Sequence, residues 1–313
     1  MGVRPLDSLT SLMLLFTLIL FLTCVDPVQA QGAGSTLSED FARWTVNGSV
    51  VHQFQSNLDR GGNFSANRFF INGRWGHPLN SNLRLGVGLR YAYEDYSFSD
   101  TVGFSGRAPW GAIHMPDLSL AAFYRTDSDW RFLGAATGGF AGESGAETGN
   151  SLIYGGILAA SRQFGPDLTL GLGAGIYRRF EETSFFPLIF VKWKISEQWS
   201  VGNALQAGPT GPAGLELVYR PGEAWAFGLG GAYRSVRFRL NRNGPTPGGI
   251  GTEKSFPVWL RLSRRLTREL NLDLYGGLMP GGELRIEDSS GRLLSTDNYQ
   301  PIPFMALSFS LRM

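Results

Sequence analysis

The feature that most constrains the fold lies in the last eleven residues, where side chains alternate strictly over 305–313. Large apolar residues at every second position alternate with small or polar ones, in the order Met305, Ala306, Leu307, Ser308, Phe309, Ser310, Leu311, Arg312, Met313. In an extended strand a period of two puts each set on its own face. A strand with one wholly apolar face fits a soluble β-sandwich or a membrane barrel, which alternates apolar-out and polar-in.

The start of the chain favours the membrane barrel. Residues 1–30 combine a positive Arg4, a short apolar stretch and the small-residue site Val28-Gln29-Ala30, a pattern typical of a cleaved signal peptide. We therefore expect a secretory signal peptide at 1–30 and a short periplasmic segment at 31–42. Cys24 is the only cysteine, so the exported chain would have no disulfide and no cysteine-based metal site.

Composition and motifs exclude several classes of function. The net charge of +2 is too balanced for a nucleic-acid-binding protein, so we expect no nucleic-acid partner. The sequence contains no Walker loop, zinc-ligand pattern or EF-hand, and we expect no cofactor and no metal. The 42 glycines together with 22 phenylalanines, 10 tyrosines and 8 tryptophans favour closely packed β-structure over helices.

One segment type recurs along the chain: a turn rich in Asp, Asn, Pro or Gly, a large apolar residue, and then alternation through glycines. It is clearest at residues 80–88 and 165–173. Six such turns predict six hairpins, to which a first and a last strand are added. The predicted strands are 43–55, 64–77, 83–96, 113–125, 130–141, 151–164, 168–180, 185–195, 199–208, 213–220, 225–239, 255–265, 270–279 and 303–313. They predict an all-β fold, a single antiparallel up-and-down transmembrane β-barrel over 43–313 with about 14 strands, twelve being the alternative.

Turn length and aromatic residues indicate how the barrel lies in a membrane. The short turns are expected on the periplasmic side, and the long loops 97–112, 142–150, 240–254 and 280–302 on the outside. Aromatic rings gather at both strand ends, as a membrane interface selects. The predicted interface residues are Trp44, Trp75, Trp130, Trp193, Trp199 and Trp225 at the short-turn end, and Tyr91, Tyr154, Tyr177 and Tyr233 at the loop end. Between the belts, Leu170 and Leu272 are expected to face lipid near the middle of the bilayer.

The whole exported chain resembles the bacterial outer-membrane β-barrel superfamily, and is most similar to one of its uncharacterised families. The resemblance is carried by the hairpin pattern, by the segment from Leu215 to Pro221 leading to Trp225, and by the terminal strand. It implies the outer membrane of a Gram-negative-type bacterium, contact with outer-membrane lipids, and a barrel-assembly machinery that reads the C-terminal strand through Phe309, Leu311 and Met313. Such barrels commonly end in Phe or Trp, and Met313 departs from that pattern.

The inward phase of the predicted strands carries the residues that would decide function. The predicted lumen-lining residues are Arg84, Arg90, Arg179, Arg220, Arg261, Glu216 and Asp273. An excess of inward cations favours a passive pore for small polar or anionic solutes. The alternative is a largely filled barrel with a structural role or a binding role for its loops, of which the basic loop around Arg237, Arg239 and Arg242 is one candidate. The sequence does not indicate the oligomeric state.

An enzyme is the rival class, because some outer-membrane barrels are hydrolases that use a histidine near the membrane rim. The three histidines here are His52, His77 and His114, and none has the spacing of a catalytic motif. We therefore predict no catalytic residues, and a membrane-rim hydrolase stays the least favoured alternative.

Overall fold

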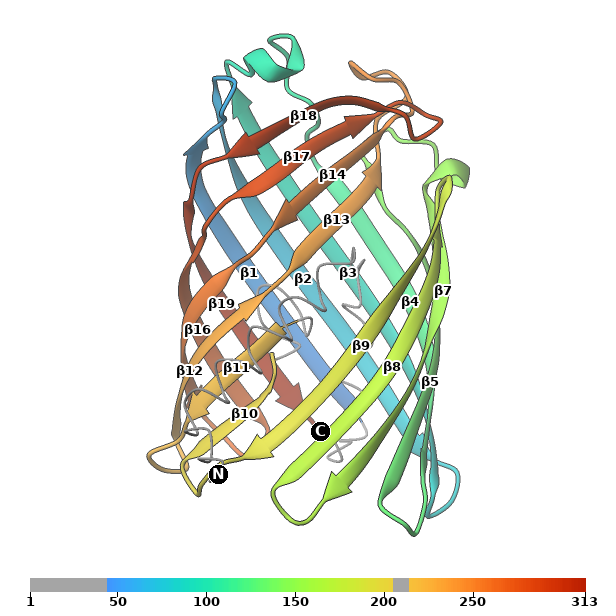
Figure 1. Ribbon diagram of the computed structural model, residues 1–313, viewed down its shortest axis with the longest axis vertical. Helices are drawn as coiled ribbons and strands as arrows, with labels where there is room; N and C mark the ends of the chain where they lie inside the picture. The colour runs from blue at the N-terminus through green and yellow to red at the C-terminus, as the bar shows by residue number, and fades with distance from the viewer. Residues whose placement is uncertain (1–43, 205–213) are drawn as a thin grey trace, which may run out of the picture.

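The computed structural model describes residues 44–204 and 214–313, which form a closed antiparallel barrel (Figure 1). The predicted signal peptide and the segment 31–42 lie outside the described residues, as do the ends at which the predicted strands 199–208 and 213–220 meet. No helix among the described residues is long and apolar enough to cross a membrane.

Fourteen strands follow one another around the wall, each antiparallel to its neighbours, and confirm the predicted fold class. They are β1 (Trp44–Asn57), β2 (Asn63–Pro78), β3 (Leu83–Ser99), β4 (Ile113–Arg125), β5 (Trp130–Phe140), β7 (Leu152–Phe164), β8 (Leu168–Arg179), β9 (Glu182–Lys194), β10 (Trp199–Asn203), β11 (Gly214–Tyr219), β12 (Trp225–Ala232), β15 (Val258–Arg265), β16 (Leu270–Met279) and β19 (Ile302–Arg312).

The first and last strands close the ring. β19 pairs with β1 from Thr45 opposite Arg312 to Gln53 opposite Phe304, and with β16 on its other edge. At the seam the backbone N–H of Trp44 donates to the carbonyl oxygen of Met313 at 2.9 Å. Closure leaves no free edge at this seam, which a lipid environment requires because it cannot satisfy backbone polar groups.

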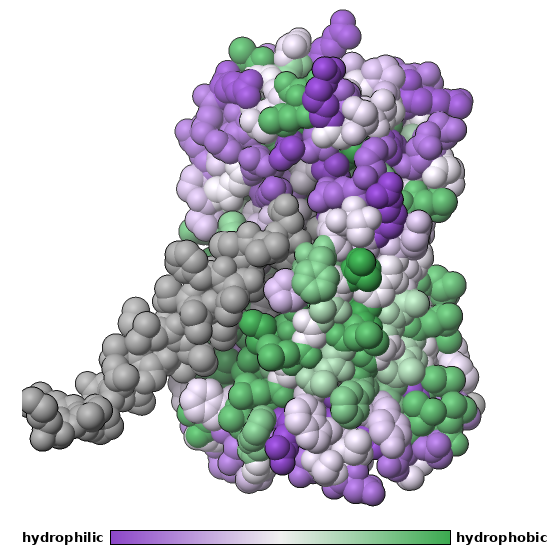
Figure 2. Space-filling model, turned by 45° about the vertical axis from the view of Figure 1, so that its right-hand side comes forward, coloured by the Kyte–Doolittle hydropathy of each residue, from purple (hydrophilic) through white to green (hydrophobic). Residues whose placement is uncertain are grey.

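The alternation of the strands sets a lipid-facing surface. Leu158, Leu172 and Leu260 are 73%, 70% and 66% exposed, whereas their strand neighbours Ile157 and Arg261 are buried. Figure 2 shows the result on its visible face, with a hydrophobic band over the lower part and a hydrophilic upper part. The apolar surface is thus turned outward, as in a transmembrane barrel.

Four short strands form a second tier above this wall: β13 (Arg234–Arg239), β14 (Ile250–Ser255), β17 (Gly282–Glu287) and β18 (Leu293–Tyr299). Each continues one wall strand beyond a break, at Tyr233, Phe256–Pro257, Pro280–Gly281 and Gln300–Pro301. Three of the breaks hold a proline, which has no N–H to donate to a strand ladder. This tier lies at the end opposite the short turns (Figure 1), and we call it the extracellular extension after the side on which the sequence predicts the long loops.

The extension corrects two sequence-based expectations. The predicted loops 240–254 and 280–302 contain β14, β17 and β18, and the predicted strand 225–239 is interrupted at Tyr233. All six residues of β13 are buried, so both of its faces are covered and it has no alternation of exposed and buried positions. β13 nevertheless falls within the predicted strand 225–239. β14, which has five buried residues, lacks the same alternation, so a period of two could not reveal it.

The extension also narrows the barrel at its outer end. β13 pairs with β14, β14 with β17 and β17 with β18, and a bridge from Tyr299 to Leu58 joins this sheet to the end of β1. On the other side Arg239 of β13 pairs with Gly142 of β6 (Gly142–Glu143), which pairs with β4. At this level the closed ring of paired strands therefore runs from β4 through β6 to β13. The strands β7, β8 and β9 are not part of it.

Candidate functional site

Four charged side chains meet inside the narrowed end of the barrel. Arg68 of β2 and Glu94 of β3 come from one wall, and Arg234 of β13 and Glu253 of β14 from the extension. Arg68 Nε lies 3.1 Å from Glu94 Oε2, and Arg68 Nη2 lies 3.0 Å from Glu253 Oε1. Arg234 Nη1 lies 2.6 Å from Glu253 Oε2, and Arg234 Nη2 pairs with Glu94. Each arginine thus bridges both glutamates, and we call the four residues the ion-pair ring.

The ion-pair ring is fully buried and electrically neutral. All four side chains are at most 1% exposed. Tyr96 Oη lies 2.7 Å from Glu94 Oε2 and 2.6 Å from Glu253 Oε2, and its one hydrogen is donated to one or the other carboxylate. Glu253 lies in the extracellular extension, outside the membrane-spanning strands. Burial alone would raise the pKa of its carboxyl, but Arg68 and Arg234 outweigh burial and lower that pKa to about 2. Glu253 is therefore charged at neutral pH.

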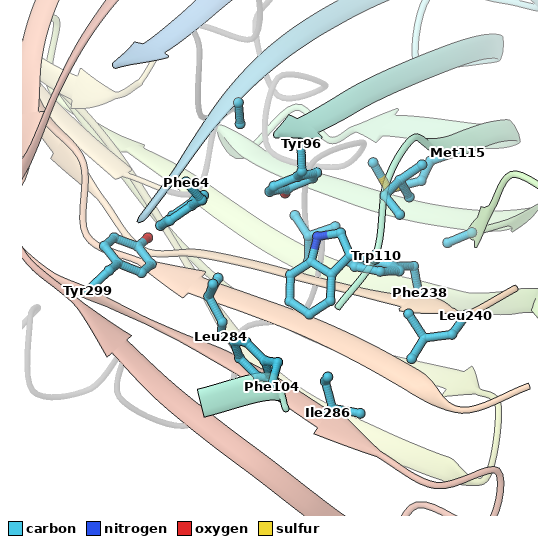
Figure 3. Close-up of a cluster of buried hydrophobic side chains, with 14 of the residues drawn as sticks. Phe64, Tyr96, Phe104, Trp110, Met115, Phe238, Leu240, Leu284, Ile286 and Tyr299 are labelled. Carbon is cyan, nitrogen blue, oxygen red and sulfur yellow. The ribbon is translucent and has the colours of Figure 1, made fainter. Parts of the chain in front are cut away.

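An apolar cluster fills the space next to the ion-pair ring, and Figure 3 shows its side chains converging from several strands. Trp110 contacts Phe238 at 5.2 Å and Tyr96 at 5.8 Å between ring centroids, each edge to face. Phe64 contacts Tyr299 at 5.0 Å in the same manner. We call this cluster the aromatic plug; its labelled members are Phe64, Tyr96, Phe104, Trp110, Met115, Phe238, Leu240, Leu284, Ile286 and Tyr299.

A second ion-pair cluster lies lower in the barrel and includes three of the predicted lumen residues. Arg261 Nη2 lies 2.7 Å from Glu216 Oε2, and Arg261 Nη1 lies 3.1 Å from Asp273 Oδ1. Trp259 Nε1 donates to Glu216 at 3.0 Å. Gly228 is required beside them, because a Cβ there would come within 2.5 Å of Glu216 Oε1. These three charges neutralise one another in part and leave one negative charge in the cluster.

The remaining predicted lumen residues lie outside the ion pairs of that cluster. Arg90 pairs with Asp117 at 3.1 Å, beside a cavity of about 30 Å³ that is large enough for a buried water. Arg179 is buried and donates to Ser184 at 2.9 Å. Arg84 and Arg220 are exposed near the short turns, where Arg220 donates to Ser200 at 3.0 Å. All of them lie in the phase opposite the exposed leucines; that they line a conducting lumen stays a prediction.

The sequence patterns did not single out Arg68, Arg234 or Glu253. Glu253 lies in a segment predicted as a loop, so no inward phase could be assigned to it. Arg234 lies in the predicted strand 225–239, whose pattern indicates no partner for it. Arg68 and Glu94 do share the inward phase of a predicted hairpin and are register partners across β2 and β3. An opposite-charge pair at such inward positions is the one signal that could have indicated the site.

Most of the predicted interface aromatics face outward, but Tyr177 does not. Trp44, Trp130, Trp199, Trp225 and Tyr154 are exposed large side chains, and Trp75, Trp193, Tyr91 and Tyr233 are partly buried. Tyr177 is 6% exposed and stacks on Phe186 at 5.8 Å inside the barrel. It shares the inward phase of Arg179, two residues on, so its assignment to the interface was wrong.

The loop arginines and the histidines have specific partners. Arg237 and Arg239 belong to the buried strand β13 rather than to a free loop; Arg237 pairs with Glu287 and Arg239 with Glu181, the latter at 2.7 Å. This pairing removes Arg237 and Arg239 from the basic loop that we considered as a binding surface. His114 Nε2 lies 3.0 Å from Ser144 Oγ, and its Nδ1 lies 2.8 Å from Tyr91 Oη.

The contact between His114 and Ser144 is the nearest approach to a hydrolase pair in the part of the chain that the structure describes. A serine nucleophile needs a base that is oriented by a third group, usually a carboxylate. Among the described residues, the group that contacts the other ring nitrogen of His114 is the Tyr91 hydroxyl and not a carboxylate. Elsewhere, His52 contacts Asn67 at 2.8 Å and His77 stacks on Trp75. The described residues also contain no group of three or more His, Cys, Asp or Glu able to hold a metal ion.

A fourteen-stranded antiparallel wall with an apolar outer face and a polar, ion-paired interior defines an outer-membrane type of β-barrel. Residues 96–295 match the family model described as a domain of unknown function (DUF6268), and the chain belongs to that family. A search of curated proteins found no match.

Solved structures similar to the chain include an outer membrane channel, a transporter and a porin. The COG4313 outer membrane channel from Pseudomonas putida F1 has 9% identity and a TM-score of 0.49, with 88% of this chain and 97% of that chain covered. The toluene transporter TodX of Pseudomonas putida has 8% identity and a TM-score of 0.46, with 92% and 94% covered. The KdgM porin has 9% identity and a TM-score of 0.33, with 85% and 99% covered. At these identities the similarity concerns the barrel fold alone.

Proposed function

We propose that the protein is a gated outer-membrane channel for small anionic solutes, closed in this conformation by the ion-pair ring and the aromatic plug. The observation that carries the proposal is the ion-pair ring, in which each arginine joins a glutamate of the β2–β3 wall to one of the extension. The ring therefore ties together two parts of the barrel that must separate for a solute to pass.

The physical chemistry of buried charges supports a switching role. Removing charges from water costs several kcal/mol per ion, and replacing a buried ion pair by apolar residues of similar volume is often neutral or stabilising. A barrel filled only for stability would have no need of four buried charges at this level. A ring in which every charge has two partners can release one partner while keeping the other, which suits a closure that opens.

The inward cations near the short turns support an anionic solute. Arg84, Lys192 and Arg220 are exposed there, and all three lie in the inward phase of their strands. Exposed cations around a mouth with low-dielectric walls raise the local concentration of anions. We propose that solutes reach the closure from this periplasmic side.

A second candidate function is a permanently filled barrel with a structural or binding role. The aromatic plug favours it, because its members are almost entirely buried and close-packed beside the ion-pair ring. A cluster of this kind loses several kcal/mol when large side chains are displaced, so opening would need a source of free energy.

The proposed location and partners follow from the same barrel. We propose that residues 1–30 direct export, that the outer face contacts outer-membrane lipids, and that barrel-assembly machinery reads β19 through Phe309, Leu311 and Met313. The pairing of β19 with both β1 and β16 supports a role for this strand in closure during assembly.

Single-channel conductance in planar bilayers separates the two candidates. The gated-channel proposal predicts long closed periods for the unmodified protein, and for Glu253→Gln an open probability raised about tenfold or more, because one partner of each arginine is weakened. Glu283→Gln in the neighbouring strand β17 is the matched control, since Glu283 is half-exposed and lies 3.8 Å from Lys254, outside the ring. Glu94→Gln is a second ring variant in case Glu253→Gln folds poorly. Each variant is first shown to be folded by heat-modifiable migration on a gel.

The possible results distinguish the gated channel from the filled barrel. Openings that increase in the ring variants and not in Glu283→Gln support a gated channel; silence in all folded variants would establish the filled barrel instead. Anion preference is tested by the reversal potential in a salt gradient. It should shift toward cations in Arg84→Glu/Arg220→Glu, and an unchanged reversal potential would overturn the anionic solute.

A further inference from the structure

The outer face of the barrel carries the same three-residue row twice. On β5, β7 and β8, Trp130 lies opposite Arg162, which lies opposite Leu170. On β12, β15 and β16, Trp225 lies opposite Arg264, which lies opposite Leu272. Both rows have the order tryptophan, arginine, leucine across adjacent strands. We call them the Trp130 row and the Trp225 row.

In both rows the guanidinium lies against the aromatic ring. Arg264 Cζ lies 4.3 Å from the ring centroid of Trp225. Arg162 Cζ lies 5.7 Å from the centroid of Trp130 and 5.6 Å from that of Phe164. These distances are within the range of cation–π contacts, which hold an arginine in one orientation and leave its N–H groups free to donate.

The two arginines are exposed and have no acidic partner among the residues that the structure describes. Trp130 and Trp225 are 38% and 40% exposed on the same face. An exposed guanidinium that lies against an aromatic ring beside an apolar surface keeps N–H groups free to bind an anion. The identity of that anion depends on the depth of the rows in the membrane.

The rows lie at the boundary between the apolar band and the short turns. Trp130 and Trp225 are the first residues of β5 and β12, directly after short turns. Exposed apolar residues such as Leu158 and Leu260 follow on the same face, farther from the turns. Tryptophan prefers this interface, where phospholipid phosphates also lie. Arginine binds phosphate through two parallel hydrogen bonds.

We propose that the Trp130 row and the Trp225 row are two binding sites for the phosphate of a phospholipid headgroup in the periplasmic leaflet. In each site the arginine binds the phosphate, the tryptophan orients the arginine, and the leucine contacts an acyl chain. The rows are separated by β9, β10 and β11 around the wall, so the two sites fix the height of opposite sides of the barrel. The proposal does not depend on whether the barrel conducts.

Native mass spectrometry of the full-length protein in detergent, titrated with phosphatidylglycerol, tests the two sites. We expect two tightly bound lipids for the unmodified protein, one for Arg162→Gln or Arg264→Gln, and none for the double variant, each loss weakening the corresponding site by about fivefold or more. Arg162→Lys should restore part of the binding, since it keeps the charge without the bidentate geometry. Arg178→Gln is the matched control, because Arg178 is an exposed outward arginine at the opposite end of β8.

Two further ligands identify the source of the phosphate. Diacylglycerol with the same acyl chains should bind equally poorly to all variants, and tight binding of diacylglycerol would overturn a phosphate site. Inorganic phosphate at millimolar concentration should not displace the lipid; displacement would assign the sites to a soluble phosphate and overturn the lipid headgroup. Unchanged phosphatidylglycerol binding in the double variant, folded by gel assay, would also refute the proposal.

Discussion

At the scale of single residues, the cost of a charge at a lipid-facing position depends on the depth of that position in the bilayer, and the strand register helps to place it. Leu170 and Leu272, expected near the middle of the bilayer, lie directly opposite Arg162 and Arg264, and each is the third residue of its strand after a short turn. Their outward phase was predicted correctly, because it depends only on the period of two. Their depth stays a prediction, because depth depends on the stagger between strands; the register now favours a position nearer the short turns than the middle of the bilayer.

Leu158→Arg should lower the free energy of unfolding by about 2–4 kcal/mol, because Leu158 is 73% exposed and lies midway along β7, near the centre of the bilayer. Leu170→Arg should cost roughly 0–1 kcal/mol, because a charge near the interface stays hydrated. Reversible denaturant titration in lipid vesicles measures both. Equal losses for the two variants would contradict the assigned depths.

At the scale of elements, the sequence predicts a hairpin well when each strand is covered on one face and faces lipid on the other, because its side chains then alternate with a period of two. β4 (113–125) begins and ends at its predicted residues, and β7 and β8 do so within one residue. β13 and β14 have both faces covered, by the aromatic plug on one side and by charged partners such as Glu181 and Glu287 on the other. Because neither face is apolar throughout, the sequence predicts a loop for most of β14 and does not show that β13 is separate from the strand before it.

The terminal strand provides a prediction at the same scale. Deleting residues 311–313 removes the pairs Val46–Leu311 and Thr45–Arg312 at the seam, together with the hydrogen bonds between Trp44 and Met313. The deletion also shortens the pairing of β19 with β16, so both edges of the closing strand are weakened and we expect the folded, heat-modifiable fraction to fall at least several-fold.

Replacing residues 311–313 by three alanines separates the two contributions of this strand. The alanine variant keeps the backbone pairs and removes the apolar side chains at Leu311 and Met313. Folding in vesicles that matches the unmodified protein, together with poor assembly in cells, would indicate that machinery reads the side chains. Normal folding of the deletion variant would contradict the importance of the seam.

At the scale of the whole molecule, the orientation of the barrel in the membrane can be tested on intact cells, because the extracellular extension and the short turns should face opposite sides. Arg292 lies in the turn between β17 and β18 with 78% of its side chain exposed, and Arg268 lies in the short turn between β15 and β16. Trypsin added to intact cells should cleave after Arg292 and leave Arg268 uncut. Cleavage at Arg268 should appear only after the outer membrane is permeabilised, which serves as the control. The reverse order would invert the proposed orientation.

The local sequence by itself determined the strands, their lipid-facing phase and the barrel class, because each depends on a period of two and on turn residues within a single hairpin. Only the tertiary structure decided which charges meet inside. Arg68 and Arg234 are far apart in the chain, and they share Glu94 and Glu253 because the kinked strands of the extension narrow the ring and bring β13 and β14 to β2 and β3. Such a contact depends on the closure and stagger of the entire barrel, which no local pattern encodes.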